Sequence, residues 1–168
     1  MQLVIISGRS GSGKSIALQA LEDLGYYAID NLPAMLLGSL VDELRDQGDR
    51  AHLAVSIDAR NLPGALERLP SLLDELRQRK IDFQVIYLTT DARILLERYS
   101  ATRRGHPLTR DSEMTLEEAI NKEETTLEDI RDLADLLIDT SRLSVHDLRR
   151  RITDQVAHQR RDKLTLTL

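Results

Sequence analysis

The sequence contains no cysteine and only one phenylalanine among its 168 residues. A chain without cysteine cannot form disulfides, which fits a reducing compartment. No apolar run approaches the roughly 18 residues that a membrane-spanning helix needs, and the first residues do not resemble a basic and apolar leader. We therefore expect a cytoplasmic protein that has no contact with a membrane.

The charge balance is acidic, with a formal net charge of −5 at pH 7. This balance argues against a surface that coats nucleic acid indiscriminately, although a local basic patch could still bind RNA. The most basic segment, residues 149–163, is such a patch, but a single phenylalanine leaves few platforms for base stacking. The length and a hydrophobic content of 41% fit one compact domain.

The most informative stretch follows an apolar run at residues 3–6 and fits the phosphate-binding template G-x-x-x-x-G-K-[ST]. Its members, all expected to contact a nucleotide, are Gly8, Arg9, Ser10, Gly11, Ser12, Gly13, Lys14 and Ser15. Glycines let successive backbone N–H groups turn toward a phosphate, and the following helix directs its positive end at the same anion. Lys14 can reach the β- and γ-phosphates and Ser15 can ligate Mg²⁺, which makes both catalytic candidates. The alternative, a glycine-rich turn without a ligand, is set aside because a strand and a helix flank the motif.

Short β-branched runs alternate along the chain with stretches of helical period, which is typical of βα units. We predict strands at residues 3–6, 27–30, 53–58, 83–88 and 135–139, and helices at 14–24, 34–47, 63–78, 91–102, 116–133 and 145–160. The expected fold class is α/β, a three-layer domain of P-loop kinase type with a central parallel five-stranded sheet. Because ligands bind beyond the carboxyl ends of such strands, polar residues there are candidate site residues.

The last six residues, 163–168, alternate apolar and polar side chains with the period of a strand. We predict a P-loop nucleotide-binding domain over residues 1–160 and interpret residues 161–168 as the start of a truncated carboxy-terminal domain or a linker. The alternative is an edge strand that returns to the same sheet.

Asp30 and Asn31 follow the second predicted strand. In phosphoryl-transfer enzymes a carboxylate at this place can hold or deprotonate an acceptor hydroxyl, so Asp30 is a catalytic candidate. The alternative is helix capping, in which either side chain satisfies free N–H groups of the helix that Pro33 opens.

The third predicted strand leads into a second polar cluster of Asp58, Ala59, Arg60 and Asn61. Asp58 follows an apolar run and could orient Mg²⁺ and its waters, as a Walker B carboxylate does. Asp58 could equally accept hydrogen bonds from guanine while Asn61 donates to guanine O6. A third possibility is that Asp58 caps the next turn. The sequence does not choose among the three.

A positively charged segment at residues 98–108 leaves a predicted helix and enters a loop marked by glycine and proline. Arg103 and Arg104 could close over the phosphates and neutralise charge on the transferred group, or could simply complement the helix dipole. We expect His106 to be a loop residue rather than a catalyst. We also expect the glutamates of the next helix to form a mostly solvated face. They are Glu117, Glu118, Glu123, Glu124 and Glu128.

The phosphate-binding template is followed by LEDLGYY at residues 21–27, DNLP at 30–33, SIDARN at 56–61, RYS at 98–100 and TRRGHPL at 102–108. In this order the motifs resemble the RapZ family of nucleotide-binding bacterial RNase adapter proteins. The resemblance extends from residue 1 to about residue 160, and several ordered motifs are far more specific than a phosphate loop alone.

The resemblance implies ATP binding at residues 8–15, GTP binding at residues 58–61 and slow nucleoside triphosphate hydrolysis. It also implies regulation, because some members carry a small regulatory RNA to an endoribonuclease and so control amino-sugar synthesis. RNA binding and assembly into a homo-oligomer are expected of longer members, through a carboxy-terminal domain that we expect to lie outside residues 1–168. The alternative function is a small-molecule kinase that transfers the γ-phosphoryl group, with Asp30 gripping the acceptor.

Overall fold

A single parallel sheet forms the centre of the protein. The computed structural model describes residues 1–48, 51–102, 105–110 and 112–166, with the backbone alone for residues 163–166. The strands are β1 (Gln2–Gly8), β2 (Tyr27–Ile29), β3 (His52–Ser56), β4 (Asp82–Thr89) and β5 (Leu136–Asp139). They pair in the order β2-β3-β1-β4-β5, and every pairing is parallel. All five predicted strands are confirmed within two residues.

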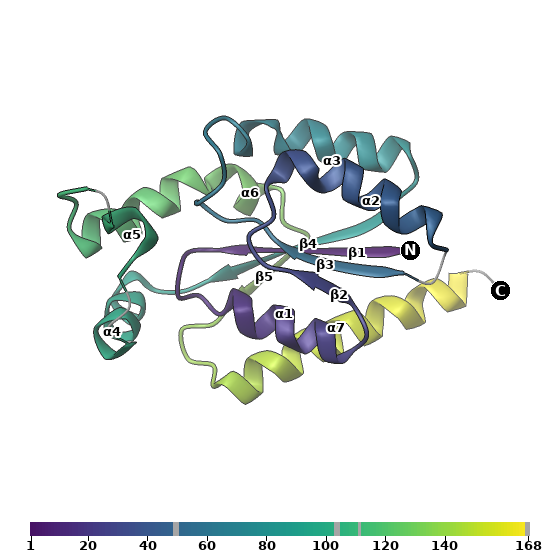
Figure 1. Ribbon diagram of the computed structural model, residues 1–168. Helices are drawn as coiled ribbons and strands as arrows, with labels where there is room; N and C mark the ends of the chain where they lie inside the picture. Colours follow the sequence, from purple (N-terminus) through teal and green to yellow (C-terminus); the bar gives the residue numbers. More distant parts are fainter. Residues whose placement is uncertain (49–50, 103–104, 111, 167–168) are drawn as a thin grey trace.

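Helices cover both faces of the sheet and confirm the three-layer α/β fold (Figure 1). One layer holds α1 (Lys14–Asp23) and α7 (Val145–Leu166), and the other holds α2 (Leu37–Asp46), α3 (Leu69–Gln78) and α6 (Glu128–Asp132). Beyond the carboxyl ends of the strands lie α4 (Ala92–Thr102) and α5 (Leu116–Thr126). Among the described residues, no helix combines the length and the apolar character that crossing a bilayer requires.

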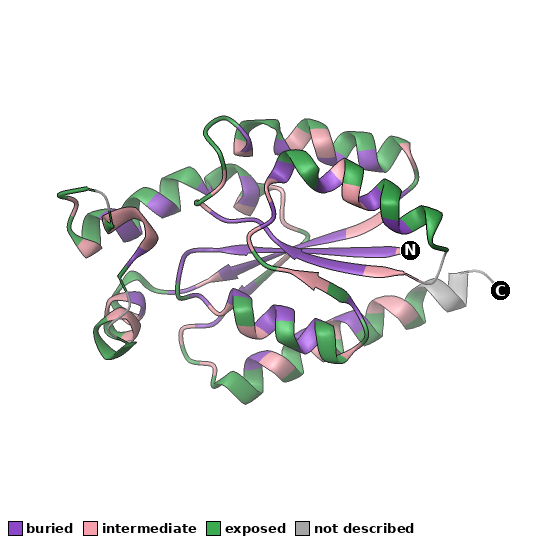
Figure 2. Ribbon diagram, viewed as in Figure 1, coloured by how far each residue is buried: buried purple, intermediate pink, exposed green. Residues whose placement is uncertain are grey.

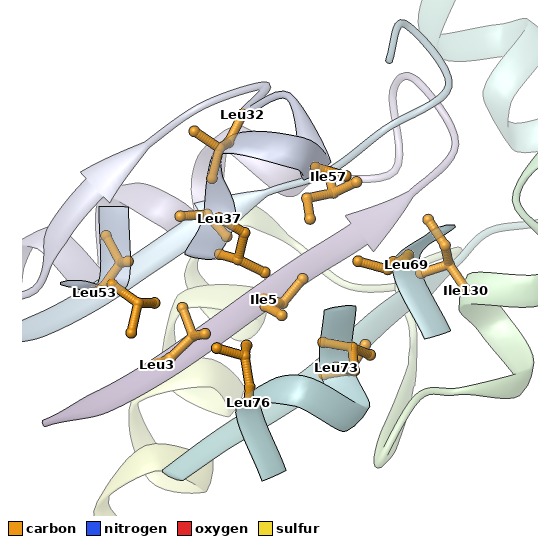
Figure 3. Close-up of a cluster of buried hydrophobic side chains, with 14 of the residues drawn as sticks. Leu3, Ile5, Leu32, Leu37, Leu53, Ile57, Leu69, Leu73, Leu76 and Ile130 are labelled. Carbon is orange, nitrogen blue, oxygen red and sulfur yellow. The ribbon is translucent and has the colours of Figure 1, made fainter. Parts of the chain in front are cut away.

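The strand β1 shows why the sheet needs a layer on each face. All seven of its residues are buried, and Figure 2 shows the same burial along most of the sheet. Leu3 and Ile5 join the apolar cluster under α2 and α3, whereas Val4 and Ile6 join the cluster under α1 and α7. Figure 3 shows Leu3 and Ile5 among leucine side chains of the first cluster. Successive side chains of a strand point to opposite faces, so a continuous apolar run is buried only between two layers.

Three predicted helices are interrupted or shortened. The segments predicted at 34–47 and 63–78 contain short 3₁₀ turns, η1 (Ala34–Leu36) and η2 (Leu66–Arg68), directly before α2 and α3. The helix predicted at 116–133 divides into α5 and α6 at Leu127, whose φ of −97° and ψ of 3° leave the helical region. Leu127 is fully buried in an apolar cluster, so packing of this side chain coincides with the break.

The strand-like alternation of residues 163–168 does not form a strand where the structure describes it, because α7 continues to Leu166. Extending an existing helix adds one hydrogen bond for each residue that it fixes, whereas a new strand needs a partner at the sheet edge. A short alternation of apolar and polar residues therefore does not override a helix that is already formed. The predicted domain boundary near residue 160 falls inside α7 and stays a prediction.

Candidate functional site

The phosphate loop, residues 8–15, connects β1 to α1 at the carboxyl edge of the sheet. Gly8, Gly11 and Gly13 have φ values of +149°, +86° and +108°, a range that residues with a Cβ rarely adopt. A Cβ on Gly8 would lie 2.7 Å from the carbonyl oxygen of Leu88 and 2.6 Å from Ser12 Oγ. The path of the loop therefore requires glycine at the positions where the template has it.

The start of α1 has the features that favour an anion. Gly13 is the N-cap and no side chain caps the helix, so its first N–H groups are open to a ligand. Lys14 is buried, and its Nζ donates to the carbonyl oxygens of Gly8 at 2.9 Å and Arg9 at 3.1 Å. Burial lowers the pKa of Lys14, and the negative charges of Asp58 and Glu123 oppose this shift. The loop thus places an ammonium group beside uncapped helix N–H groups.

A cavity of about 650 Å³ opens on the phosphate loop. Asp30 and Arg60 line one part of it, Ser15 lies on the loop itself, and Leu143 and Val145 line another part. The volume falls in the range of small-molecule and cofactor sites. The wall formed by residues 140–148 was not predicted, because no motif marks it. Only the neighbouring positions of β1, β4 and β5 in the sheet bring it to the loop.

Asp30 lies exposed at the end of β2, as the sequence predicted. Its Oδ1 accepts a hydrogen bond of 2.5 Å from Ser56 Oγ, which in turn accepts one from the backbone N–H of Asn31 at 2.7 Å. The capping alternative is wrong, because Pro33 is the N-cap of η1 and the backbone N–H of Ala34 donates to Asn61 instead of to Asp30 or Asn31. The hydrogen bond from β3 instead holds the Asp30 carboxylate at the wall of the cavity.

Asp58 is buried and paired with Arg60. Its Oδ2 accepts from Arg60 Nη2 at 2.7 Å, and its Oδ1 accepts from Arg60 Nε at 3.1 Å and from the Arg60 backbone N–H at 2.9 Å. Burial opposes ionisation of this carboxyl, but the hydrogen bonds from Arg60 and the charge of Lys14 hold the pKa of Asp58 below its usual value. Of the three roles left open by the sequence, the turn-forming one is visible in these contacts.

Ser15 and Asp58 fit a magnesium ion to different degrees. The exposed hydroxyl of Ser15 lines the cavity, and Mg²⁺ commonly combines such an oxygen with phosphate oxygens and water. Both Asp58 oxygens are engaged by Arg60, so a metal ion would have to displace the guanidinium. Within the described part of the chain, no three His, Cys, Asp or Glu residues gather as a metal site. Ser15 is therefore the residue here that would hold Mg²⁺ bound with a nucleotide.

Asn61 clamps the segment that follows β2. Its Nδ2 donates to the carbonyl oxygen of Leu32 at 2.9 Å, and its Oδ1 accepts from the backbone N–H of Ala34 at 3.0 Å. Asn61 thus supplies the cap of η1 for which the sequence offered Asp30 or Asn31 as an alternative. Of residues 58–61, all described, Arg60 lines the cavity, whereas Ala59 packs on an apolar cluster.

The arginines of the predicted lid, Arg103 and Arg104, lie outside the described residues. Arg98, on α4, is bound to the phosphate loop: its Nη1 donates to the carbonyl oxygen of Gly11 at 2.8 Å and its Nη2 to that of Thr140 at 2.7 Å. Arg98 therefore connects α4, the phosphate loop and the end of β5.

The prediction that the glutamates form a solvated face is wrong for Glu123, because its side chain is buried. The other four glutamates are exposed, but only 1% of the Glu123 side chain is. Its Oε1 accepts from Ser10 Oγ at 2.6 Å, and its Oε2 accepts from the Ser10 backbone N–H at 3.0 Å and from His106 Nε2 at 2.8 Å. Glu123 follows the buried residues Ala119 and Ile120 by four and three positions, which puts it on the inner face of α5. That spacing is the signal that could have identified it.

The family model described as the RapZ-like N-terminal domain matches residues 1–160. The chain belongs to this family. It is 71% identical over 168 residues to a nucleotide-binding protein of Chromohalobacter salexigens, covering 99% of this chain and 56% of that protein. A nucleotide-binding protein of Tolumonas auensis is 47% identical over 167 residues, covering 99% and 57%. The RapZ-like chain spans a little over half the length of these curated relatives.

Solved structures similar to this RapZ-like domain include two small-molecule kinases. A gluconokinase from Sinorhizobium meliloti superposes with a TM-score of 0.64 at 19% identity, covering 99% of this chain and 98% of that chain. A shikimate kinase from Acinetobacter baumannii, in complex with shikimate, gives a TM-score of 0.57 at 18% identity, covering 94% and 93%. These similarities confirm the P-loop kinase-like fold.

Proposed function

We propose that this RapZ-like domain binds a nucleoside triphosphate, ATP or GTP, with its phosphates on the phosphate loop. The observation that carries the proposal is the uncapped start of α1, where Gly11, Gly13 and Lys14 line a cavity of about 650 Å³. Helix N–H groups and an ammonium group together favour a multiply charged anion. The names of the two curated relatives, both nucleotide-binding proteins, support the same proposal.

The apolar part of the cavity is the proposed place of the base. Leu143, Val145 and Leu148 line it, and Val145 is 57% exposed. Aliphatic surfaces of this kind contact the face of any base, which agrees with binding of both ATP and GTP. The hydrogen bonds of Asp58 and Asn61 within the protein favour a structural role for residues 58–61 over the reading of guanine.

Slow hydrolysis is the proposed reaction, and regulation is the proposed role. Fast hydrolysis needs a group that orients the attacking water. Two carboxylates near the loop are already engaged, Asp58 by Arg60 and Glu123 by Ser10 and His106. We propose that the bound nucleotide acts mainly as a signal. The longer protein would use it in an RNase adapter role, with a regulatory RNA, an endoribonuclease and further copies of itself as partners.

The test is nucleotide binding by a Lys14→Met variant, which keeps the apolar stem of the side chain. We expect the Kd for ATP and GTP to rise at least about tenfold, because charge-assisted hydrogen bonds to phosphate are lost. Isothermal titration calorimetry measures the affinity and circular dichroism checks the fold. The matched control is Lys122→Met, which removes a lysine charge from the exposed face of α5. Unchanged affinity in a folded Lys14→Met variant would refute the proposal.

A second candidate, phosphoryl transfer to a small molecule, rests on Asp30 and Arg60 in the wall of the same cavity. A carboxylate beside a guanidinium can hold an anion that carries a hydroxyl group. In transfer, the acceptor oxygen would bond to the γ-phosphorus, the bond to the β-phosphate oxygen would break, and Asp30 would take the hydroxyl proton. ATP labelled in the γ-phosphate, incubated with hydroxy acids, separates a labelled acceptor from labelled inorganic phosphate. Asp30→Asn should then stop transfer and leave ATP binding intact.

A further inference from the structure

Three residues from separate segments meet in one buried cluster beside the phosphate loop. Ser10 belongs to the loop, His106 precedes the 3₁₀ turn η3 (Pro107–Thr109), and Glu123 lies on α5. Their exposed fractions are 8% for Ser10 and 1% for His106 and for Glu123. Of the three, the sequence identified only Ser10 as a site residue, because Ser10 belongs to the phosphate-binding template.

The carboxylate of Glu123 is the common acceptor of the cluster. It receives the backbone N–H and the hydroxyl of Ser10 on one side and the His106 ring on the other. An ionised carboxylate only accepts hydrogen bonds, so three donors that converge on it form a consistent set. Hydrogen bonds to a charged, buried group are stronger than neutral ones.

The hydrogen bonds of His106 define its tautomer. The backbone N–H of Leu108 donates to His106 Nδ1 at 3.0 Å, so Nδ1 carries a lone pair. The ring proton of the neutral imidazole is then on Nε2, which faces Glu123 at 2.8 Å. His106 therefore connects the backbone of η3 with Glu123 through its two ring nitrogens.

The cluster controls how Ser10 is oriented. Ser10 lines the cavity, yet both its donors point to Glu123. Without this acceptor, a buried N–H group of the loop would be unpaired, which is unfavourable. Arg98 holds the carbonyl oxygen of the next residue, Gly11, so two consecutive residues of the loop are bound by side chains of other elements.

We propose that Glu123 and His106 are positioning residues of the phosphate loop, which hold its first turn in the conformation that binds nucleotide phosphates. The proposal rests on the proposed nucleotide binding. A loop that is already ordered loses less conformational entropy when the ligand binds, so its preorganisation raises affinity. Neither side chain needs to touch the nucleotide for this effect.

Two variants separate positioning from ordinary structural support. Glu123→Gln leaves one oxygen acceptor for the three donors. His106→Asn keeps an oxygen that can accept from the Leu108 N–H, as asparagine does at helix N-caps, but its shorter side chain cannot reach Glu123. Glu117→Gln is the matched control, since it neutralises an exposed glutamate on the same helix.

The experiment measures the Kd for ATP and GTP by calorimetry and the unfolding temperature of each variant. We expect Glu123→Gln to raise the Kd about tenfold and His106→Asn to raise it less, with Glu117→Gln unchanged. The double variant should bind nucleotide no more weakly than Glu123→Gln alone, because both substitutions break the same connection from His106 through Glu123 to Ser10. Nitrogen-15 shifts of His106 should report the Nε2–H tautomer in the wild type and a changed ring signal in Glu123→Gln.

Several outcomes would overturn the inference. If both variants fold, unfold at lower temperature and bind nucleotide with the wild-type Kd, the cluster only stabilises the fold. Tighter binding by Glu123→Gln would mean that the carboxylate opposes the phosphates instead of positioning the loop. If Glu123→Gln does not fold, the Kd of His106→Asn tests the inference, and an unchanged Kd would refute it. Failure of the wild type itself to bind ATP and GTP would refute the proposed function, and this role with it.

Discussion

A Gly8→Ala substitution measures how strongly the fold depends on the first glycine of the phosphate loop. The φ of +149° at Gly8 costs a residue with a Cβ about 1–3 kcal/mol. The new Cβ would also lie 2.7 Å from the carbonyl oxygen of Leu88, which pairs with Gly8 across β1 and β4 and cannot easily move. Such overpacking costs a further ~1–3 kcal/mol. We expect the free energy of unfolding to fall by about 2–6 kcal/mol.

Two other glycines provide matched controls. Gly64 has a φ of +76° but no atom within 4 Å of its Cβ position, so Gly64→Ala should cost only the backbone strain of about 1–3 kcal/mol. Gly38 lies in α2 with open space around it, and Gly38→Ala should stabilise the chain by about 1 kcal/mol. Urea unfolding with a constant m-value gives all three differences. If Gly8→Ala is no more destabilising than Gly64→Ala, the steric argument is wrong.

Three further predictions concern the acid stability, the base and the RNA. The pKa of Asp58 is held below its ordinary value of 3.8, so its ionised form stabilises the fold above that pH and the stabilisation is lost as the pH falls through the lowered pKa. In urea unfolding, the difference between the wild type and Asp58→Asn should be full at neutral pH and shrink in acid, and a difference independent of pH would contradict this. Asn61→Ala should cost about 1–3 kcal/mol of stability and leave the affinities for GTP and ATP in their wild-type ratio, whereas a loss confined to GTP in calorimetry would favour the reading of guanine. The isolated chain should bind regulatory RNA weakly and with steep salt dependence in gel-shift titrations, and tight binding at physiological salt would place an RNA site within residues 1–168.

The interior of the fold was largely predictable because its signals are local. The continuous apolar run of β1 predicts a strand that is buried on both faces, and the glycine spacing after it predicts a loop with positive φ angles. Periodicity alone did not show that Leu127 interrupts a helix or that α7 extends through residues 163–166, because packing and helix propagation decide such boundaries.

The candidate site was predictable only where one segment supplies it. The sequence by itself determined the phosphate loop, since its glycines, Lys14 and the start of α1 are consecutive residues whose geometry follows from the backbone. Only the tertiary structure decided that Asn61 is engaged by the segment after β2 and that Glu123 is buried against Ser10. The physical reason is that a hydrogen bond depends on which groups meet within about 3 Å, and residues 113 positions apart meet only when the sheet order and the helix packing bring them together.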